Sequence, residues 1–565
     1  MQRSIWISSF SFSALFSALT ASAQFNFDYT APIINYRAIV NAASLTPPGL
    51  GGSEIAQGSI FSITGQQLGP ATLTQASSFP LLTTLAGVSV KVTQGNTSVN
   101  AFPLAVSAGQ VDAIMPSNAP LGQVSIQVTY NNDTSNMASA SVAANSFGIF
   151  ALNGNGFGPG SLQNFIAQNN QPVNTLSEPA VPGQMVTLWG TGLGAVAGGD
   201  NVAPPAGSLP TQVEIFVGGL LASSSYSGRS SCCAGLDQIV FQLPAAVPLG
   251  CYVPVQIRTS GTTLSNAITM AISADGGPCS DPGNAVAPLF AAGGSVGAAI
   301  LSRTMLRTDV DTSQPTDVSI DQALISLQDA PGSGLFFHSA LSAPPLGTCT
   351  MYSVSGRTLT LNLPDFSGGL GTGLDAGPAI AIAGTSQASL NRSPLLPFYA
   401  GSLGTDDPYF GASTLVFNES GPTAISAPGG AGVGAFQVAV PPAVQVNWLN
   451  RLQIETIDRT QPLTVIWSPD GLQNTTIVIG ASNYDLLTNT TRTFICTANP
   501  AAGSFAVPSY ILGAFLPSSN ALGGSYGVLG LAAVPAQGLT TFTASGLDAG
   551  IAVQTFTSAK TVLFQ

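Results

Sequence analysis

Ionisable side chains are scarce in this sequence. Only 7% of its 565 residues are Asp, Glu, Lys or Arg, and it has one histidine and two lysines, Lys91 and Lys560. Helix surfaces usually carry Glu, Lys and Arg, so this shortage favours β structure throughout. The net charge of −12 leaves no basic patch that could neutralise phosphates. We therefore expect an all-β protein with no nucleic-acid partner.

Long apolar runs are missing beyond the N-terminus. Gly, Pro or polar residues interrupt every later run before it reaches the ~20 residues that a membrane-spanning helix needs. Residues 1–23 combine the basic Arg3, an apolar stretch and the small-residue site Ala21-Ser22-Ala23, which is the pattern of a signal peptide. We expect cleavage after Ala23, no membrane span in the mature chain, and a secreted or cell-surface location.

The six cysteines fit export to an oxidising compartment. They are Cys232, Cys233, Cys251, Cys279, Cys349 and Cys496. A bond between Cys232 and Cys233 would be strained, because neighbouring Cα atoms are only ~3.8 Å apart. We predict that one of these two joins Cys251 and the other joins Cys279, and that Cys349 joins Cys496. A zinc site is the alternative, but the C-x₂₋₄-C spacing of zinc ligands is absent.

One stretch of the sequence occurs twice. Residues 55–70 read IAQGSIFSITGQQLGP and residues 180–196 read AVPGQMVTLWGTGLGAV. Gly58, Gly65, Leu68 and Gly69 of the first stretch recur 125 residues later as Gly183, Gly190, Leu193 and Gly194. Further matches follow at slightly larger offsets, ending with Asn136 and Asn266, which are 130 residues apart. This small drift indicates one fold used twice, with short loop insertions.

Short alternating runs within both copies predict half-buried strands. In residues 88–92 and 124–130, Val and Ile alternate with polar residues, and residues 213–217 and 253–257 behave similarly. Several such strands in about 100 residues are typical of an immunoglobulin-like β-sandwich. We predict sandwiches at 24–145 and 146–276, a linker at 277–292, and β-rich domains, one or two further sandwiches, at 293–427 and 428–565. The one helix candidate is 319–328, where apolar residues share a helical face, and a strand is an equal alternative there.

The two copies resemble IPT/TIG domains. The resemblance covers residues 37–275 and rests on NAAS at 41–44, GQVDAIMP at 109–116 and SEPAVPGQMVTLWGTGLG at 177–194. This pattern of residues is similar to a two-copy module found in exported proteins of soil Acidobacteria. The resemblance implies extracellular immunoglobulin-like sandwiches that serve in adhesion or as spacers, and it carries over no catalytic or ligand residues. The region after 285 is only faintly similar to the unassigned C-terminal domains that accompany this module.

Catalytic patterns are weak. Gly-x-Ser-x-Gly motifs surround Ser295 and Ser525, and His338 follows Ser295 in the order of an α/β-hydrolase triad. That motif needs a strand–turn–helix in a parallel sheet, which this sequence does not predict, so a structural or loop role for His338 is preferred. Glycosidase chemistry needs two facing carboxylates. The candidates are Asp365, Asp375, Asp406, Asp407, Glu455 and Asp458.

Ligand-binding candidates are also few. Asp309, Asp311 and Ser313, followed by Asp317 and Asp321, suggest calcium, but the EF-hand glycine and glutamate are missing, so only a loose loop site stays as an alternative. In predicted strands, Trp189, Trp448 and Trp467 are better explained as core or rim residues than as sugar platforms. We propose a ligand edge in a turn-rich stretch with exposed aromatic residues. Its residues are Tyr399, Asp406, Asp407, Tyr409 and Phe410.

These observations predict an exported, non-enzymatic multidomain β protein without a cofactor. The immunoglobulin-like repeats are expected to form a scaffold for adhesion, or for binding an extracellular glycan or protein. The alternative is a secreted glycan-active enzyme with a carboxylate pair in residues 285–565.

Overall fold

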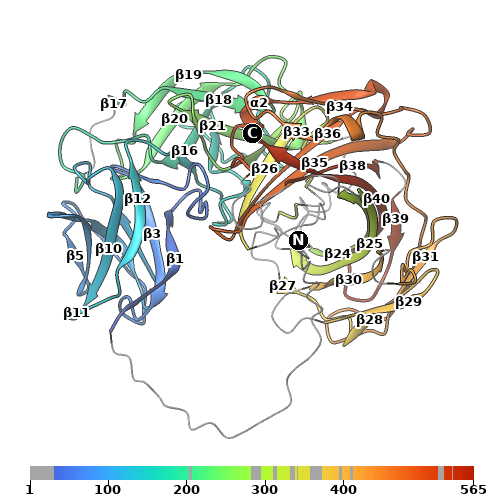
Figure 1. The fold of residues 1–565 in the computed structure, drawn as a ribbon. Coiled ribbons are helices and arrows are strands. Elements are labelled where there is room, and N and C mark those ends of the chain that lie inside the picture. Colours follow the sequence, from blue (N-terminus) through green and yellow to red (C-terminus); the bar gives the residue numbers. More distant parts are fainter. Residues whose placement is uncertain are drawn as a thin grey trace, which may run out of the picture.

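The protein is built almost entirely of β-strands (Figure 1). The computed structural model describes residues 31–202, 207–281, 294–308, 315–330, 337–339, 342–356, 372–392, 398–407, 411–518, 527–536 and 539–565. Within these ranges the helical elements are α2 (Ser509–Leu512) and the 3₁₀ turns η1 (Arg451–Gln453) and η2 (Pro500–Ala502). No helix in this part of the chain is long and apolar enough to cross a membrane. The all-β prediction is confirmed.

The first copy is a sandwich of two sheets, here called sandwich 1. One sheet contains, in spatial order, β1 (Ile33–Asn41), β3 (Ile60–Gln66), β9 (Gln110–Ile114), β8 (Phe102–Val106) and β4 (Thr74–Gln75). The other contains β2 (Ile55–Ala56), β12 (Ala138–Ala143), β10 (Gly122–Tyr130), β6 (Val88–Gln94) and β5 (Thr84–Leu85), with β7 (Thr97–Asn100) and β11 (Asp133–Thr134) beside them. Val88, Val90 and Val92 are completely buried, as their alternation predicts.

The second copy, sandwich 2, repeats this plan. Its strands run in the order β13 (Gly148–Ile149), β16 (Met185–Thr191), β20 (Asp237–Gln242), β19 (Leu220–Arg229), β18 (Val213–Val217), β21 (Gly250–Thr259), β23 (Ile268–Ile272) and β14 (Gly158–Pro159). Beside them lie β15 (Leu162–Asn164), β17 (Gly207–Ser208) and β22 (Thr263–Leu264). Because β19 pairs with both β18 and β20, it joins the two layers.

The repeated glycines lie where two backbones approach closely. A Cβ on Gly65 would lie 2.1 Å from the Ile33 carbonyl oxygen, and one on Gly190 would lie 2.4 Å from that of Gly148. No side chain fits such a gap, which explains glycine at both positions. The leucines that follow, Leu68 and Leu193, are buried in the cores of their sandwiches.

The C-terminal half forms one long, curved sheet. Its order is β26 (Cys349–Ser355), β36 (Thr490–Ala498), β35 (Thr475–Asp485), β38 (Gly527–Pro535), β40 (Ala549–Phe564), β24 (Gly294–Thr308), β25 (Thr316–Ala330) and β27 (Thr372–Gly373). Beside these strands lie β30 (Phe398–Asp406), β33 (Thr456–Ile457) and β39 (Thr540–Phe542). A four-stranded sheet of β29 (Gln387–Asn391), β28 (Ala379–Ala383), β31 (Thr423–Ala427) and β32 (Phe436–Val440) and a two-stranded sheet of β34 (Leu463–Ile466) and β37 (Ser504–Val507) accompany it.

The predicted boundary at 427/428 crosses this sheet. β24, from before the boundary, runs parallel to β40, the last strand of the chain, over twelve paired positions from Val296 to Arg307. β26 likewise pairs with β36. The strands on either side of residue 428 therefore share a sheet rather than forming two separate ones.

Of the two alternatives for 319–328, helix and strand, the structure shows the strand. This segment lies within β25, between β24 and β30. Ala323, Ile325 and Leu327 are buried on one face, a period of two that the sequence masks with apolar residues at intermediate positions. Pairing on both sides satisfies the backbone of this strand, so tertiary contacts decide its conformation.

Three disulfides are present, and two differ from the predicted pairing. Cys349 joins Cys496 across neighbouring strands, as predicted. Cys251 joins Cys279, and Cys232 joins Cys233 in the β19–β20 loop. The prediction for these four residues is wrong because Cys251 and Cys279 lie in a separate cluster against the C-terminal sheet. Only its neighbour is then left for Cys232.

Candidate functional site

The candidate site is a groove of 480 Å³ on sandwich 1, between β1 and β12. Each of these strands is an end strand of its sheet along this stretch, so the two layers are open toward each other here. The floor is formed by small or apolar side chains, and the rim is formed by amides, hydroxyls and a phenol. The floor residues include Ala38, Ile39, Ile55, Ala138 and Ala140, and the rim residues include Asn35, Tyr36, Ser53, Gln123, Ser139 and Ser141.

A bulge in β1 creates the groove. β1 pairs with β3 at Ile34 and again at Ile39, and the residues between them, Asn35–Ala38, leave the ladder. Ile34 is held at one end of the groove by the side chain of Asn136, which accepts the Ile34 N–H at 2.8 Å and donates to its carbonyl at 3.1 Å. Tyr36 is 88% exposed and Met137 is 72% exposed, so both project at the rim.

The groove is lined mainly by uncharged side chains. Among its described lining residues there is no Asp, Glu, His, Cys or Lys. The Arg37 guanidinium donates to the Thr488 carbonyl in the β35–β36 hairpin, so it also ties the groove to the C-terminal half. The described lining thus lacks the carboxylates and imidazole that most often act as general acids and bases, and its ionisable side chains are Tyr36 and Arg37. It offers backbone edges, amides, hydroxyls and one exposed aromatic ring.

The stretch 399–410, predicted to be an exposed ligand edge, is partly a strand with a buried tyrosine. Tyr399 is 1% exposed, not exposed as predicted, because it lies inside β30 rather than in a turn. Its hydroxyl donates to the Gly377 carbonyl and accepts the Ala376 N–H. Asp406 ends β30 and is exposed, and Asp407 follows it half-buried. Tyr409 and Phe410 lie outside the described residues.

The triad candidates show structural roles. Ser295 lies at the start of β24, where its hydroxyl donates to Asp329 and its N–H donates to Asp548. His338 is 1% exposed and follows Phe337 in an aromatic cluster against sandwich 2. Ser525 lies outside the described residues. The nucleophile turn also lacks its frame, because β24 continues from Ser295 as a strand.

Two of the carboxylates proposed for glycan hydrolysis, Asp375 and Asp458, bond to neighbouring side chains. Asp375 pairs with Arg392 at 2.9 Å. Asp458 is fully exposed, and its hydrogen bonds with Thr460 lower its pKa. Asp406 ends β30, and Glu455 lies beside β33, whereas Asp365 lies outside the described residues.

The calcium candidates are held by arginines. Asp317 pairs with Arg307 and Arg451, and Asp321 receives two hydrogen bonds from Arg303. Asp309, Asp311 and Ser313 lie outside the described residues. Elsewhere in the described ranges, no group of three or more His, Cys, Asp or Glu side chains could hold a metal ion.

Two of the three candidate tryptophans are buried, and the third is half-buried. Trp448 and Trp467 are 7% and 1% exposed and bridge to each other, which confirms the core interpretation. Trp189 is half-buried, and its indole N–H donates to Gln163 at 3.0 Å. The exposed aromatic ring that lines the groove is Tyr36, which is not among the candidates predicted from the sequence. The signal that could have found it is the bulge, which alternation alone does not reveal.

A buried ion pair holds the two sandwiches in place. Arg229 lies 3.2 Å from Asp237, and both are almost completely buried. Arg229 also donates to the carbonyls of Gly58, in sandwich 1, and Gly194, in sandwich 2. Burial raises the pKa of Asp237 to about 6, although Arg229 and two backbone N–H groups oppose this rise. This pair fixes geometry and is too enclosed to act on a ligand.

Sandwich 2 and the C-terminal sheet also share a core. Tyr252 and Cys251 of sandwich 2 pack with Phe337 and Tyr352. Phe216 stacks on Tyr510, with ring centroids 4.1 Å apart. The groove therefore lies on a scaffold whose parts are joined by packed side chains.

Comparisons with known proteins leave the family open. No family model matches the chain, and no curated protein matches it. Among solved structures, gamma-CGTase from alkalophilic Bacillus clarkii is 10% identical and covers 48% of this chain and 34% of its own, with a TM-score of 0.16. This chain thus spans about a third of that protein.

Two further solved structures are similarly distant. SGBP-B from a xyloglucan utilization locus in Bacteroides uniformis is 11% identical and covers 66% of this chain and 86% of its own, with a TM-score of 0.15. Domains 5–6 of the S-layer protein SbsC are 11% identical and cover 43% of this chain and 99% of their own, also with a TM-score of 0.15. Scores this low carry no argument about function, which must come from the site itself.

Proposed function

We propose that this chain is an exported, non-enzymatic adhesion protein that binds an extracellular polymer, a glycan or a protein chain, in the groove of sandwich 1. The observation that carries the proposal is a 480 Å³ groove lined by amides, hydroxyls and an exposed Tyr36, with no carboxylate or imidazole among its described residues. Such a surface can hydrogen-bond a neutral ligand and stack against it, but it has no acid–base pair.

The rest of the chain supports this role as a scaffold. The three disulfides fit an extracellular location. The two sandwiches, proposed to be IPT/TIG domains, are joined by Arg229 of sandwich 2, which pairs with the buried Asp237 and donates to the Gly58 carbonyl of sandwich 1. The signal peptide at 1–23 and its removal after Ala23 belong to the same proposal.

The test uses the chain from Gln24 to Gln565, screened for binding and for hydrolysis against one panel of purified cell-surface polysaccharides and extended peptides. Tyr36→Ala should weaken binding at least tenfold, because a stacked aromatic residue is lost. Leu82→Ala is the matched control, since Leu82 is 70% exposed on the same sandwich but does not line the groove. Turnover of any panel member, or equal binding by both variants, would contradict the proposal.

A further inference from the structure

The two copies differ at one edge. In sandwich 1, β12 pairs with β10 along one side, while on the other side only Val142 and Ala143 are paired, with β2. In the described part of the chain no strand covers Ala138–Ser141 on that second side. This uncovered edge is one wall of the groove.

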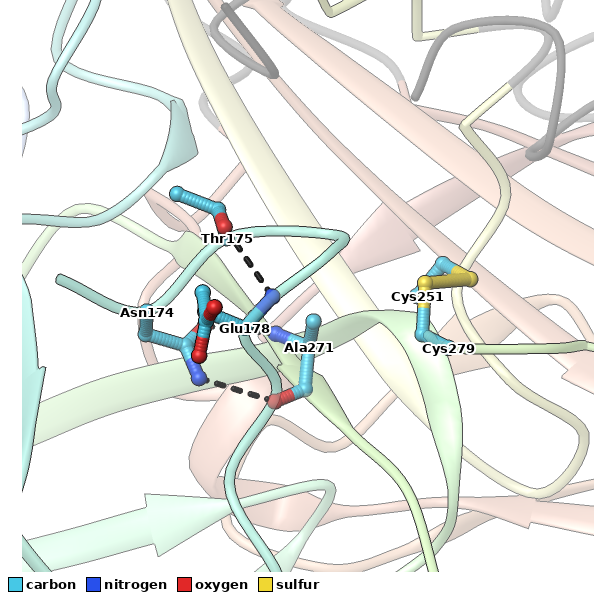
Figure 2. Close-up of a disulfide and its surroundings, with 6 residues drawn as sticks. All are labelled: Asn174, Thr175, Glu178, Cys251, Ala271 and Cys279. Carbon is cyan, nitrogen blue, oxygen red and sulfur yellow. Dashed lines mark hydrogen bonds between the residues drawn. A yellow bond between two sulfur atoms is a disulfide. The ribbon is translucent and has the colours of Figure 1, made fainter. Parts of the chain in front are cut away.

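Sandwich 2 covers the equivalent edge with its own chain. Gly158 and Pro159 of β14 run parallel to Ile268 and Thr269 of β23. Next to them, Asn174 donates to the Ala271 carbonyl and accepts its N–H (Figure 2). Ala180 then bridges to Ile272. The whole outer edge of β23 is therefore occupied.

The length of one loop explains the difference. Ile34 and Ile39 in sandwich 1 pair with Gly65 and Ile63, and Ile149 and Leu162 pair in the same way with Gly190 and Leu188 in sandwich 2. Between these anchors sandwich 1 has four residues, 35–38, and sandwich 2 has twelve, 150–161. The longer loop contains β14, which covers Ile268 and Thr269 of β23, and the four-residue loop is too short to form such a strand. Asn174 and Ala180, which cover Ala271 and Ile272, follow this loop in the chain.

Side-chain size in the groove shows the same difference. Ala138 and Ala140 pair with Ile126 and Val124, as Ile268 and Met270 pair with Val255 and Val253. Sandwich 2 thus has two large, buried side chains where sandwich 1 has alanines. An occupant of the groove must bring an extended backbone for β12 and large apolar side chains at alternate positions to fill the space above the alanines.

The N-terminal segment of the mature chain has this pattern. Phe25, Phe27 and Tyr29 alternate with Asn26, Asp28 and Thr30. A period of two predicts a strand with one aromatic face and one polar face. We propose that this segment, Phe25–Thr30, from a second copy of the chain, adds to β12 and fills the groove of sandwich 1. The inference rests on the proposed function, since it identifies a second copy of the chain as the protein partner that occupies the same groove.

The chain's own segment is poorly placed to do this. Only Ala31 and Pro32 separate it from Ile33, the first residue of β1. Folding back would put Pro32 at the third position of a tight turn, where proline is disfavoured, and Pro32 also biases Ala31 toward an extended conformation. Donation to another copy avoids this reversal. Because each copy has one strand to give and one groove to fill, association is head-to-tail.

The test measures the mass of the chain from Gln24 to Gln565 by sedimentation over a range of concentrations. The wild-type chain should form species larger than a monomer as its concentration rises. The double variant Ala138→Ile with Ala140→Met introduces the side chains that sandwich 2 has at the equivalent positions. It should fill the groove and leave the chain monomeric. Phe27→Asp should remove the donor strand with the same result. A mixture of the two variants should give a one-to-one dimer and nothing longer, because only one donor and one groove are intact.

Matched controls separate these effects from misfolding. Ser98→Met adds a methionine to an exposed position on β7, and Asn26→Asp adds a charge to the polar face of the donor; both should associate as the wild type does. Ala140→Met alone is the second groove variant, and melting curves check that each variant folds. A wild-type chain that stays monomeric, or association that survives both Phe27→Asp and the filled groove, overturns the inference. In the first case the proposed function still stands if Tyr36→Ala lowers ligand binding.

Discussion

Arg229 of sandwich 2 donates a hydrogen bond of 2.8 Å to the carbonyl of Gly58, the first repeated glycine of sandwich 1. The same guanidinium donates at 2.7 Å to the carbonyl of Gly194, the last repeated glycine of sandwich 2. The repeated stretches of the two sandwiches thus meet at one side chain. The repeat is a structural joint between the copies, and the groove lies elsewhere on sandwich 1.

Removing Arg229 should loosen this joint. Arg229→Met leaves the buried Asp237 without its cation and two carbonyls without a donor, so we expect a loss of about 3 kcal/mol or more in unfolding free energy. Arg258→Met is the control, because its pair with Glu214 is partly exposed and should contribute less than about 1 kcal/mol. Denaturant unfolding measures both, and equal losses would argue against the joint.

The titration of Asp237 should appear in the pH dependence of stability. Its pKa in the folded chain, about 6, lies above the ordinary value of 3.8, so the folded state favours the protonated form. The stabilising contribution is complete below pH 3.8 and is lost as the pH rises through 6. The advantage of wild type over Asp237→Asn should therefore fall between pH 4 and 7, by at most about 3 kcal/mol. A difference that grows with pH would reverse this sign.

The disulfides should differ strongly in their effect on stability. Cys349 and Cys496 are 147 residues apart, so replacing both by alanine should cost about 2–5 kcal/mol through the entropy of the unfolded chain. Cys232 and Cys233 are adjacent and close no loop, so Cys232→Ser with Cys233→Ser should cost less than about 1 kcal/mol. Unfolding of the non-reduced proteins gives both values. Peptide mapping under the same conditions should find no free thiol.

Asn136 and Asn266, which occupy equivalent positions in the two sandwiches, should each slow hydrogen exchange at the amide that they bond. Asn266 bonds the N–H and carbonyl of Ile149 as Asn136 bonds those of Ile34. Asn136→Ala and Asn266→Ala should each lose about 1–3 kcal/mol. Each should also speed hydrogen exchange at its own isoleucine amide. Asn100→Ala, at an exposed position on β7, is the control and should change neither amide.

Some features followed from local sequence alone. Alternation along 88–92 and 124–130 and the spacing of Gly65 and Gly190 depend on pleat and turn geometry, which a short stretch of residues specifies. They were enough to predict an all-β chain with a duplicated sandwich. The Cys349–Cys496 bond was also predicted, because four cysteines cluster and leave these two.

Tertiary structure decided the rest. Residues 319–328 are a strand because β24 and β30 pair with them. Tyr399 is buried because it packs in the core between the long sheet and the four-stranded sheet, and Cys232 joins Cys233 because Cys251 and Cys279 lie elsewhere. The open groove of sandwich 1 results from a loop of four residues where sandwich 2 has twelve, and from two alanines where sandwich 2 has Ile268 and Met270. Those differences acquire meaning only once strand pairing shows which positions correspond, since an uncovered edge is a property of neighbours in space and not of any one segment.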